Sequence, residues 1–153
     1  MTELADKHAE NARVRKLSER ISAAQGPEIA MMQGWLKQNG ESEKVGGEEH
    51  GGHEGHGTHG GQSGHGEHDA HGGTADMPGM ASPQELDRLR AARDGDFDRL
   101  FLKLMTAHHK GAVTMATDLL SGGNDVRVNE MATDVIAQQN AEIDRMDKLL
   151  RPS

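Results

Sequence analysis

The chain contains no cysteine and very few aromatic residues, and both shortages restrict what the protein can be. Without cysteine it forms no disulfide, thiolate zinc site or cysteine nucleophile. The aromatic residues are two Phe and one Trp, and only 33% of the 153 residues are hydrophobic. The length fits one domain, but a packed core that runs through the whole chain is not expected.

Long apolar segments and clusters of basic charge are also missing. No apolar segment approaches the roughly 18 residues of a transmembrane helix, and the charged N-terminus carries no recognisable signal peptide. Lys and Arg are scattered singly, so we expect no nucleic-acid partner. Most of the net charge of −8 lies in residues 41–76, which hold eight acidic residues and one lysine. A cytoplasmic protein and a chain that begins after an export signal both stay open.

Composition divides the chain into three parts. Residues 1–39 have helical periodicity over 3–39, in which Gly26-Pro27 predicts a kink or break because proline lacks an N–H and clashes with the preceding turn. Residues 40–76 contain thirteen Gly and seven His and almost no apolar side chain, which predicts a disordered linker.

Residues 77–153 form the main predicted helical unit. Its helices, judged from apolar periodicity and from cap residues, are expected at 83–92, 96–121 and 125–150. The predicted fold class is therefore all-α, an antiparallel helical bundle interrupted by a His/Gly-rich linker.

An internal repeat relates the two helical parts. Residues 13–36 match residues 127–150 at a constant offset of 114, which indicates duplication. The repeat pairs Gln25 with Gln139, Glu28 with Glu142 and Met32 with Met146. The first-repeat equivalent of 96–116 would lie before residue 1. We therefore expect either a late-starting form of the protein or a partner, such as a homodimer that completes the bundle.

A histidine pair marks the helix predicted at 96–121. Its apolar periodicity places His108 near the centre of the apolar face and His109 on its edge, with Met105 and Met115 nearby. An imidazole on such a face needs a partner. Either the histidines hydrogen-bond across to Glu142 or Gln139, or thioethers and imidazoles bind a metal such as Cu(I), Cu(II) or zinc. Adjacent histidines diverge by about 100° on a helix, so a second helix or chain must contribute ligands.

Two other segments are candidates for metal binding. Met77 and Met80 flank a Pro-Gly turn that could bring two thioethers together, although a linker that happens to contain Met is the simpler interpretation. The linker histidines recur at short spacing on a flexible chain and predict several modest sites for divalent ions. They are His50, His53, His56, His59, His65, His68 and His71.

These segments resemble the bacterial family catalogued as domain of unknown function 305. The resemblance rests on FDRLFLKLMTAHHKGAVTMA (97–116), QQNAEIDRM (138–146) and DMPGMASPQEL (76–86), and QGPEIAMMQGWL (25–36) looks like the family's second helix. It implies a ferritin-like four-helix bundle that is exported to the periplasm or held in the cell envelope. It also implies copper or silver binding through Met and His in some members. Carried over by position, the candidate ligands are Met105, His108, His109, Met115, Met77, Met80 and Met146, with Gln139 and Glu142 as supporting residues.

The leading hypothesis is a non-enzymatic protein that binds and sequesters copper for metal homeostasis or tolerance. The linker is expected to capture further ions such as silver, zinc or nickel. One alternative is a ferritin-like metal-dependent oxidase, against which the absence of Glu-x-x-His pairs counts. The other is a structural helical interaction module without metal.

Overall fold

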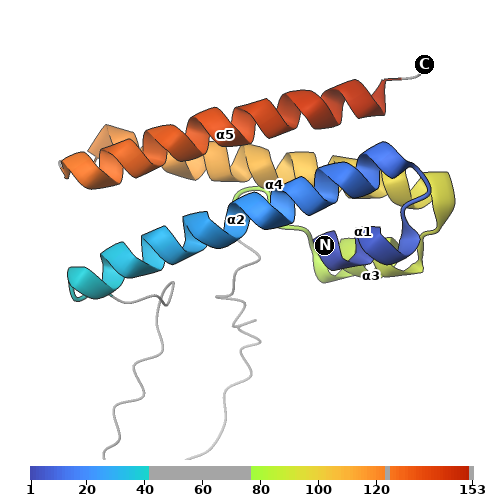
Figure 1. The fold of residues 1–153 in the computed structure, drawn as a ribbon, viewed down its shortest axis with the longest axis horizontal. Helices are drawn as coiled ribbons and strands as arrows, with labels where there is room; N and C mark the ends of the chain where they lie inside the picture. The colour runs from blue at the N-terminus through green and yellow to red at the C-terminus, as the bar shows by residue number, and fades with distance from the viewer. Residues whose placement is uncertain (42–76, 123–124, 152–153) are drawn as a thin grey trace, which may run out of the picture.

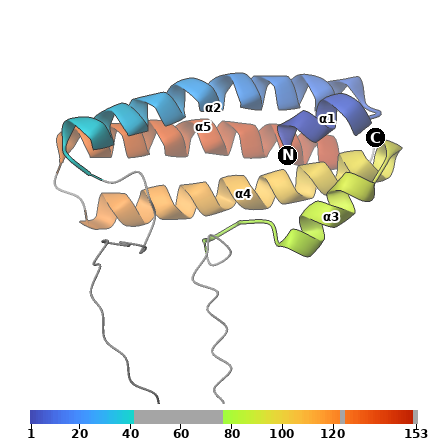
Figure 2. The same cartoon turned by 90° about the horizontal axis from the view of Figure 1, so that it is seen from below.

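The computed structural model describes residues 1–41, 77–122 and 125–151, most of which lie in helices and none of which lies in a strand. The predicted disordered linker at 40–76 lies almost entirely outside the described residues. Three long helices lie side by side along the molecule, and two short helices gather at one end (Figures 1 and 2). They are α1 (Thr2–His8), α2 (Ala12–Gln38), α3 (Pro83–Ala91), α4 (Asp94–Gly122) and α5 (Val126–Leu150). The predicted all-α class is confirmed.

The first helical part is divided near its start and not at its proline. Ala9 is extended, and Asn11 caps α2 by accepting a hydrogen bond from the Arg13 N–H at 2.9 Å. The predicted break at Pro27 was wrong, because α2 continues through it. Pro27 and Ala23, whose carbonyl loses its helical partner, are both exposed, so water can satisfy that carbonyl.

Local signals account for the starts of the other helices. Ser82 and Glu85 form a capping box at α3, and the hydrogen bonds from Ser82 hold the pKa of the Glu85 carboxyl below its usual range. Asp125 caps α5 by accepting from the Val128 N–H at 2.9 Å. Asn11 and Asp125 are repeat-equivalent positions, since they differ by the offset of 114. The two repeats therefore begin their helices at the same place.

The described segments share one hydrophobic core. Helices α4 and α5 pack along most of their length, and α1 folds back along the first half of α2, where the Ser18 hydroxyl donates to the Thr2 carbonyl at 3.2 Å. One buried cluster joins side chains from all five helices, among them Val14, Ile21, Leu89, Phe97, Phe101, Met105, Ile143 and Met146. Residues 1–39 are thus packed against the second helical part.

Candidate functional site

His109 lies fully buried between α4 and α5, where both ring nitrogens have acceptors. Its Nε2 is 2.6 Å from Oε2 of Glu142, and its Nδ1 is 2.9 Å from the Met105 carbonyl oxygen. Since Nδ1 faces only a carbonyl, it must donate its proton there. Nε2 is within hydrogen-bond distance of the Glu142 carboxyl group. Both ring nitrogens of His109 thus have hydrogen-bond partners, so His109 can bind a metal only if its contact with Glu142 opens.

The positions predicted for the two histidines are exchanged. His109 was expected on the edge of the apolar face and is fully buried, whereas His108 was expected at its centre and is half-buried. The physical reason is that α4 has different neighbours on two sides. Helix α5 covers the side of Met105 and His109, while α1 and α3 cover the side of Phe97 only at one end of the molecule.

His108 is the histidine that keeps an unused ligand atom. Its Nδ1 is buried and has no hydrogen-bond partner among the described residues. Burial, followed by the neighbouring His109 and the N-terminal amino group, lowers the pKa of the His108 imidazole. A neutral imidazole with a free nitrogen is the form that binds transition metals.

The Met77–Met80 turn packs directly on α4 beside His108. The Met80 N–H donates to the Met77 carbonyl at 3.2 Å, and Gly79 has a φ of 78°. A Cβ on Gly79 would overlap the carbonyl of Ala107, and a Cβ on Gly111 would overlap the carbonyl of Pro78. Ala107 and Gly111 enclose His108 within one helical turn. The backbone therefore holds the Met77–Met80 turn against α4 within one helical turn of His108.

The remaining predicted residues fall into two groups. Met105, Met146 and Gln139 are buried around the His109–Glu142 pair, and the Thr106 hydroxyl lies 3.6 Å from the Met146 sulfur. Met115 is exposed, about two turns of α4 beyond His108. The predicted ligands thus do not form one cluster, and the seven linker histidines, His50 to His71, lie outside the described residues.

A second carboxylate, Glu28 on α2, approaches the buried pair. Burial and the nearby Glu142 raise the pKa of Glu28, and His109 acts in the opposite direction. Glu28 was not among the predicted supporting residues. Its match to Glu142 in the repeat was the available signal.

Nothing among the described residues resembles a site for a hard metal ion. Within residues 1–41, 77–122 and 125–151, no three His, Asp or Glu side chains are grouped so that they could hold a metal. No helix in the same ranges is long and apolar enough to cross a membrane.

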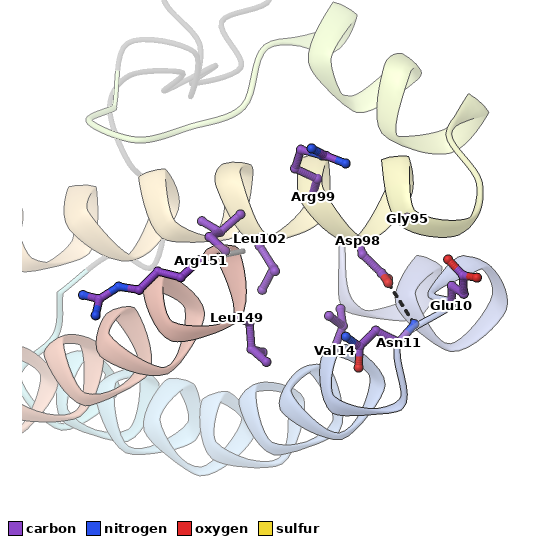
Figure 3. Close-up of a pocket in the computed structure, with 10 residues that line it drawn as sticks. Glu10, Asn11, Val14, Gly95, Asp98, Arg99, Leu102, Leu149 and Arg151 are labelled. Atoms are coloured by element: carbon purple, nitrogen blue, oxygen red, sulfur yellow. Dashed lines mark hydrogen bonds between the residues drawn. The ribbon is translucent and has the colours of Figure 1, made fainter. Parts of the chain in front are cut away.

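One hollow lies apart from these residues. It has a volume of about 670 Å³ and lies where α2 and α4 begin and α5 ends (Figure 3). Asp98 is buried in its wall, and its Oδ2 accepts a hydrogen bond from the Asn11 N–H at 2.8 Å. This contact fixes the start of α2 against α4.

Comparisons with known proteins agree on one family. The family model described as Domain of unknown function (DUF305) matches residues 1–150. A DUF305 fragment from Deinococcus radiodurans has 25% identity and a TM-score of 0.73 over 97% of this chain and 82% of that chain. A DUF305 protein of Streptomyces coelicolor, described provisionally as secreted, has 22% identity and a TM-score of 0.72 over 97% and 80%.

One curated relative is viral. The uncharacterized protein L153 of Acanthamoeba polyphaga mimivirus is 36% identical over 53 residues, which are 35% of this chain and 35% of that protein. The match therefore spans about a third of either protein.

Proposed function

Since this chain belongs to the DUF305 family, a family defined without a function, we propose from its own residues that it binds and sequesters copper without catalysing a reaction. The observation that carries the proposal is the packing of the Met77–Met80 turn on Ala107 and Gly111 of α4, within one helical turn of His108, whose Nδ1 has no hydrogen-bond partner among the described residues. Two thioethers and one imidazole are a soft ligand set that suits Cu(I), and silver has similar preferences.

The neighbouring side chains fit this role. His108 is partly desolvated and resists protonation, so it offers a lone pair at the mildly acidic pH at which exposed histidines become charged. Gly79 and Gly111 let the turn approach α4 without a side chain between them. The Glu142–His109 pair beneath supports the helix surface that carries His108 and is not itself needed as a ligand.

The histidine-rich segment 40–76 would act as a second, weaker capture site. Its imidazoles suit Cu(II), zinc or nickel and would release these ions on protonation. We place the protein in the periplasm or another extracytoplasmic compartment, by analogy with the Streptomyces relative, which is provisionally described as secreted. A homodimer is also proposed, and the surface that it would use is described in the next subsection.

The His109–Glu142 pair, in which both histidine nitrogens have hydrogen-bond partners, favours one alternative function. A buried histidine whose two nitrogens are both satisfied is typical of structural packing, so the α4–α5 interface alone is also what a helical interaction module without metal would have. That interpretation predicts no copper retained by the purified protein.

Anaerobic titration of Cu(I) against a chromophoric chelator tests the proposal. Replacing the thioethers in Met77→Leu/Met80→Leu keeps side-chain volume, and His108→Gln removes the imidazole. Each should weaken the tightest site by roughly tenfold or more. Met115→Leu on the exposed part of α4 is the matched control and should bind as the wild type does. Deletion of residues 45–73 should lower the number of ions bound without weakening the tightest site. Equal affinities in all variants would contradict the proposal.

A further inference from the structure

One side of α2 carries a continuous row of residues, the α2 stripe, whose covering stops halfway. The row follows helical spacing and consists of Val14, Leu17, Ser18, Ile21, Gln25, Glu28, Ile29, Met32 and Leu36. The first four are buried, because α1 folds back over them. Beyond the level of α1 the same row opens to solvent, with Ile29 49% and Met32 39% exposed.

The internal repeat indicates that this exposed half of α2 has the residues of a packed helix face and not of a polar surface. The counterparts of Ile29 and Met32 on α5 are Ile143 and Met146, which are only 8% and 0% exposed because α4 packs over them. Glu28 has the same relation to Glu142. Glu142 has His109 as its partner, while Glu28 makes no hydrogen bond within the described residues. The exposed half of α2 therefore has the chemistry of a helix interface without a helix on it.

The uncovered surface extends onto α4. Met115 is 42% and Leu119 is 45% exposed, and both lie in the last third of α4 at the end of the molecule where α2 ends (Figure 1). Helix α1 lies beside one end of α2 and does not reach the other end (Figure 2). Exposed apolar side chains of this size, present on α2 and α4 at the same end of the molecule, are typical of an interaction surface.

The direction in which a covering helix would have to run indicates which helix could pack on the exposed half of the α2 stripe. A helix there would continue the line of α1, and α1 runs antiparallel to α2 since Thr2 lies opposite Ser18. A two-fold axis beside Met32 brings the α2 of a second molecule into this place, antiparallel by symmetry and with the same stripe facing inward. Ile29 of each molecule then lies near Trp35 and Leu36 of the other. Unbranched methionines adapt readily to such a contact.

The negative charge of Glu28 is compatible with this antiparallel packing of two α2 helices. Glu28 is the acidic residue of the stripe, and it lies four residues from Met32. At 1.5 Å per residue, two copies of Glu28 about the axis are about 12 Å apart along the helices. At that separation the two carboxylates repel each other much less than a directly apposed pair would.

We propose that the exposed half of the α2 stripe, with Met115 and Leu119 of α4, is the interface of a homodimer formed by antiparallel packing of α2 on α2. The interface does not depend on copper. A metal-free dimer is therefore expected, and its loss would leave the site at His108 unaffected.

Sedimentation velocity of the full metal-free chain from micromolar to millimolar concentration tests the interface. Wild type should dimerise, and Ile29→Ser/Met32→Ser should weaken dimerisation by about tenfold or more. Met31→Ser is the matched control, because Met31 is 42% exposed but lies off the stripe, and it should dimerise as wild type does. Circular dichroism checks that each variant is folded, which is expected since all three positions are exposed.

Three outcomes would overturn the proposal. The wild type could stay monomeric throughout the range, or the Ile29→Ser/Met32→Ser variant could dimerise as strongly as wild type. A monomeric chain that instead binds a peptide of residues 96–121, with binding lost in the same variant, would assign the surface to a separate helix of the α4 type.

Discussion

His109 Nε2 and Glu142 Oε2 lie 2.6 Å apart in the interior. This contact joins α4 and α5, which pack against each other more extensively than any other two described helices. Removing the carboxylate would leave a buried imidazole nitrogen without a partner. We expect Glu142→Ala to lower the free energy of unfolding by about 3 kcal/mol, and Glu142→Gln, which keeps an acceptor oxygen, to lower it by less. Urea unfolding of the metal-free protein measures both. Equal small losses in the two variants would mean that the contact contributes little.

Gly111 is required by the close approach of Pro78. In Gly111→Ala the new methyl group would displace the Met77–Met80 turn from α4, so both stability and Cu(I) affinity should fall. Gly34→Ala is the matched control, because no atom lies within 4 Å of a Cβ there. That substitution in a helix interior should raise the free energy of unfolding by roughly 0.5–1 kcal/mol. Unchanged Cu(I) affinity in Gly111→Ala would mean that the Met77–Met80 turn is not part of the metal site.

The lowered pKa of His108 makes the metal-free protein less stable in mild acid. Below the ordinary pKa of 6.5 the unfolded chain takes up a proton that the folded protein resists. The free energy of unfolding should therefore decrease as the pH falls from about 6.5 through the lowered folded pKa, and then level off. His108→Gln should remove this part of the pH dependence. Urea unfolding at several pH values gives the measurement, and an unchanged slope in the variant would contradict the assignment.

Glu28 produces a pH dependence of the opposite sign. Its pKa is raised on folding, so the protonated carboxyl favours the folded state below the ordinary pKa of 4.5. That advantage is lost as the pH rises through the folded pKa. We expect Glu28→Gln to be more stable than wild type at pH 7, with the difference shrinking in acid. Glu19→Gln, an exposed change on the same helix, should show no such gain, and a destabilised Glu28→Gln would refute the prediction.

Much of the fold follows from local sequence signals, and what was missed depends on tertiary contacts. Helix starts were predicted at residues 83 and 125, and α3 and α5 begin at Pro83 and Val126. The caps Ser82 and Asp125 depend only on their own neighbours along the chain, which is why these starts can be predicted locally. Asn11 carries the same signal, yet the helical periodicity across it predicted one continuous helix. At Pro27 the local rule failed, because solvent on that side of α2 satisfies the freed carbonyl.

The candidate site was predicted in residue type but not in arrangement. Periodicity identifies the apolar side of α4 but cannot tell which neighbour covers which part of it. That is why His108 and His109 exchanged places. The approach of Met77–Met80 to α4 depends on Gly111, whose role becomes evident only when Pro78 lies against it.

The central claim is that thioether sulfur and the His108 imidazole bind Cu(I) together. X-ray absorption spectroscopy of the full chain loaded anaerobically with less than one equivalent of Cu(I) tests it most directly. Two sulfur ligands and one nitrogen ligand are predicted, with the sulfur scattering lost in Met77→Leu/Met80→Leu and retained in Met115→Leu. A shell of nitrogen and oxygen alone in the wild-type protein would contradict the account.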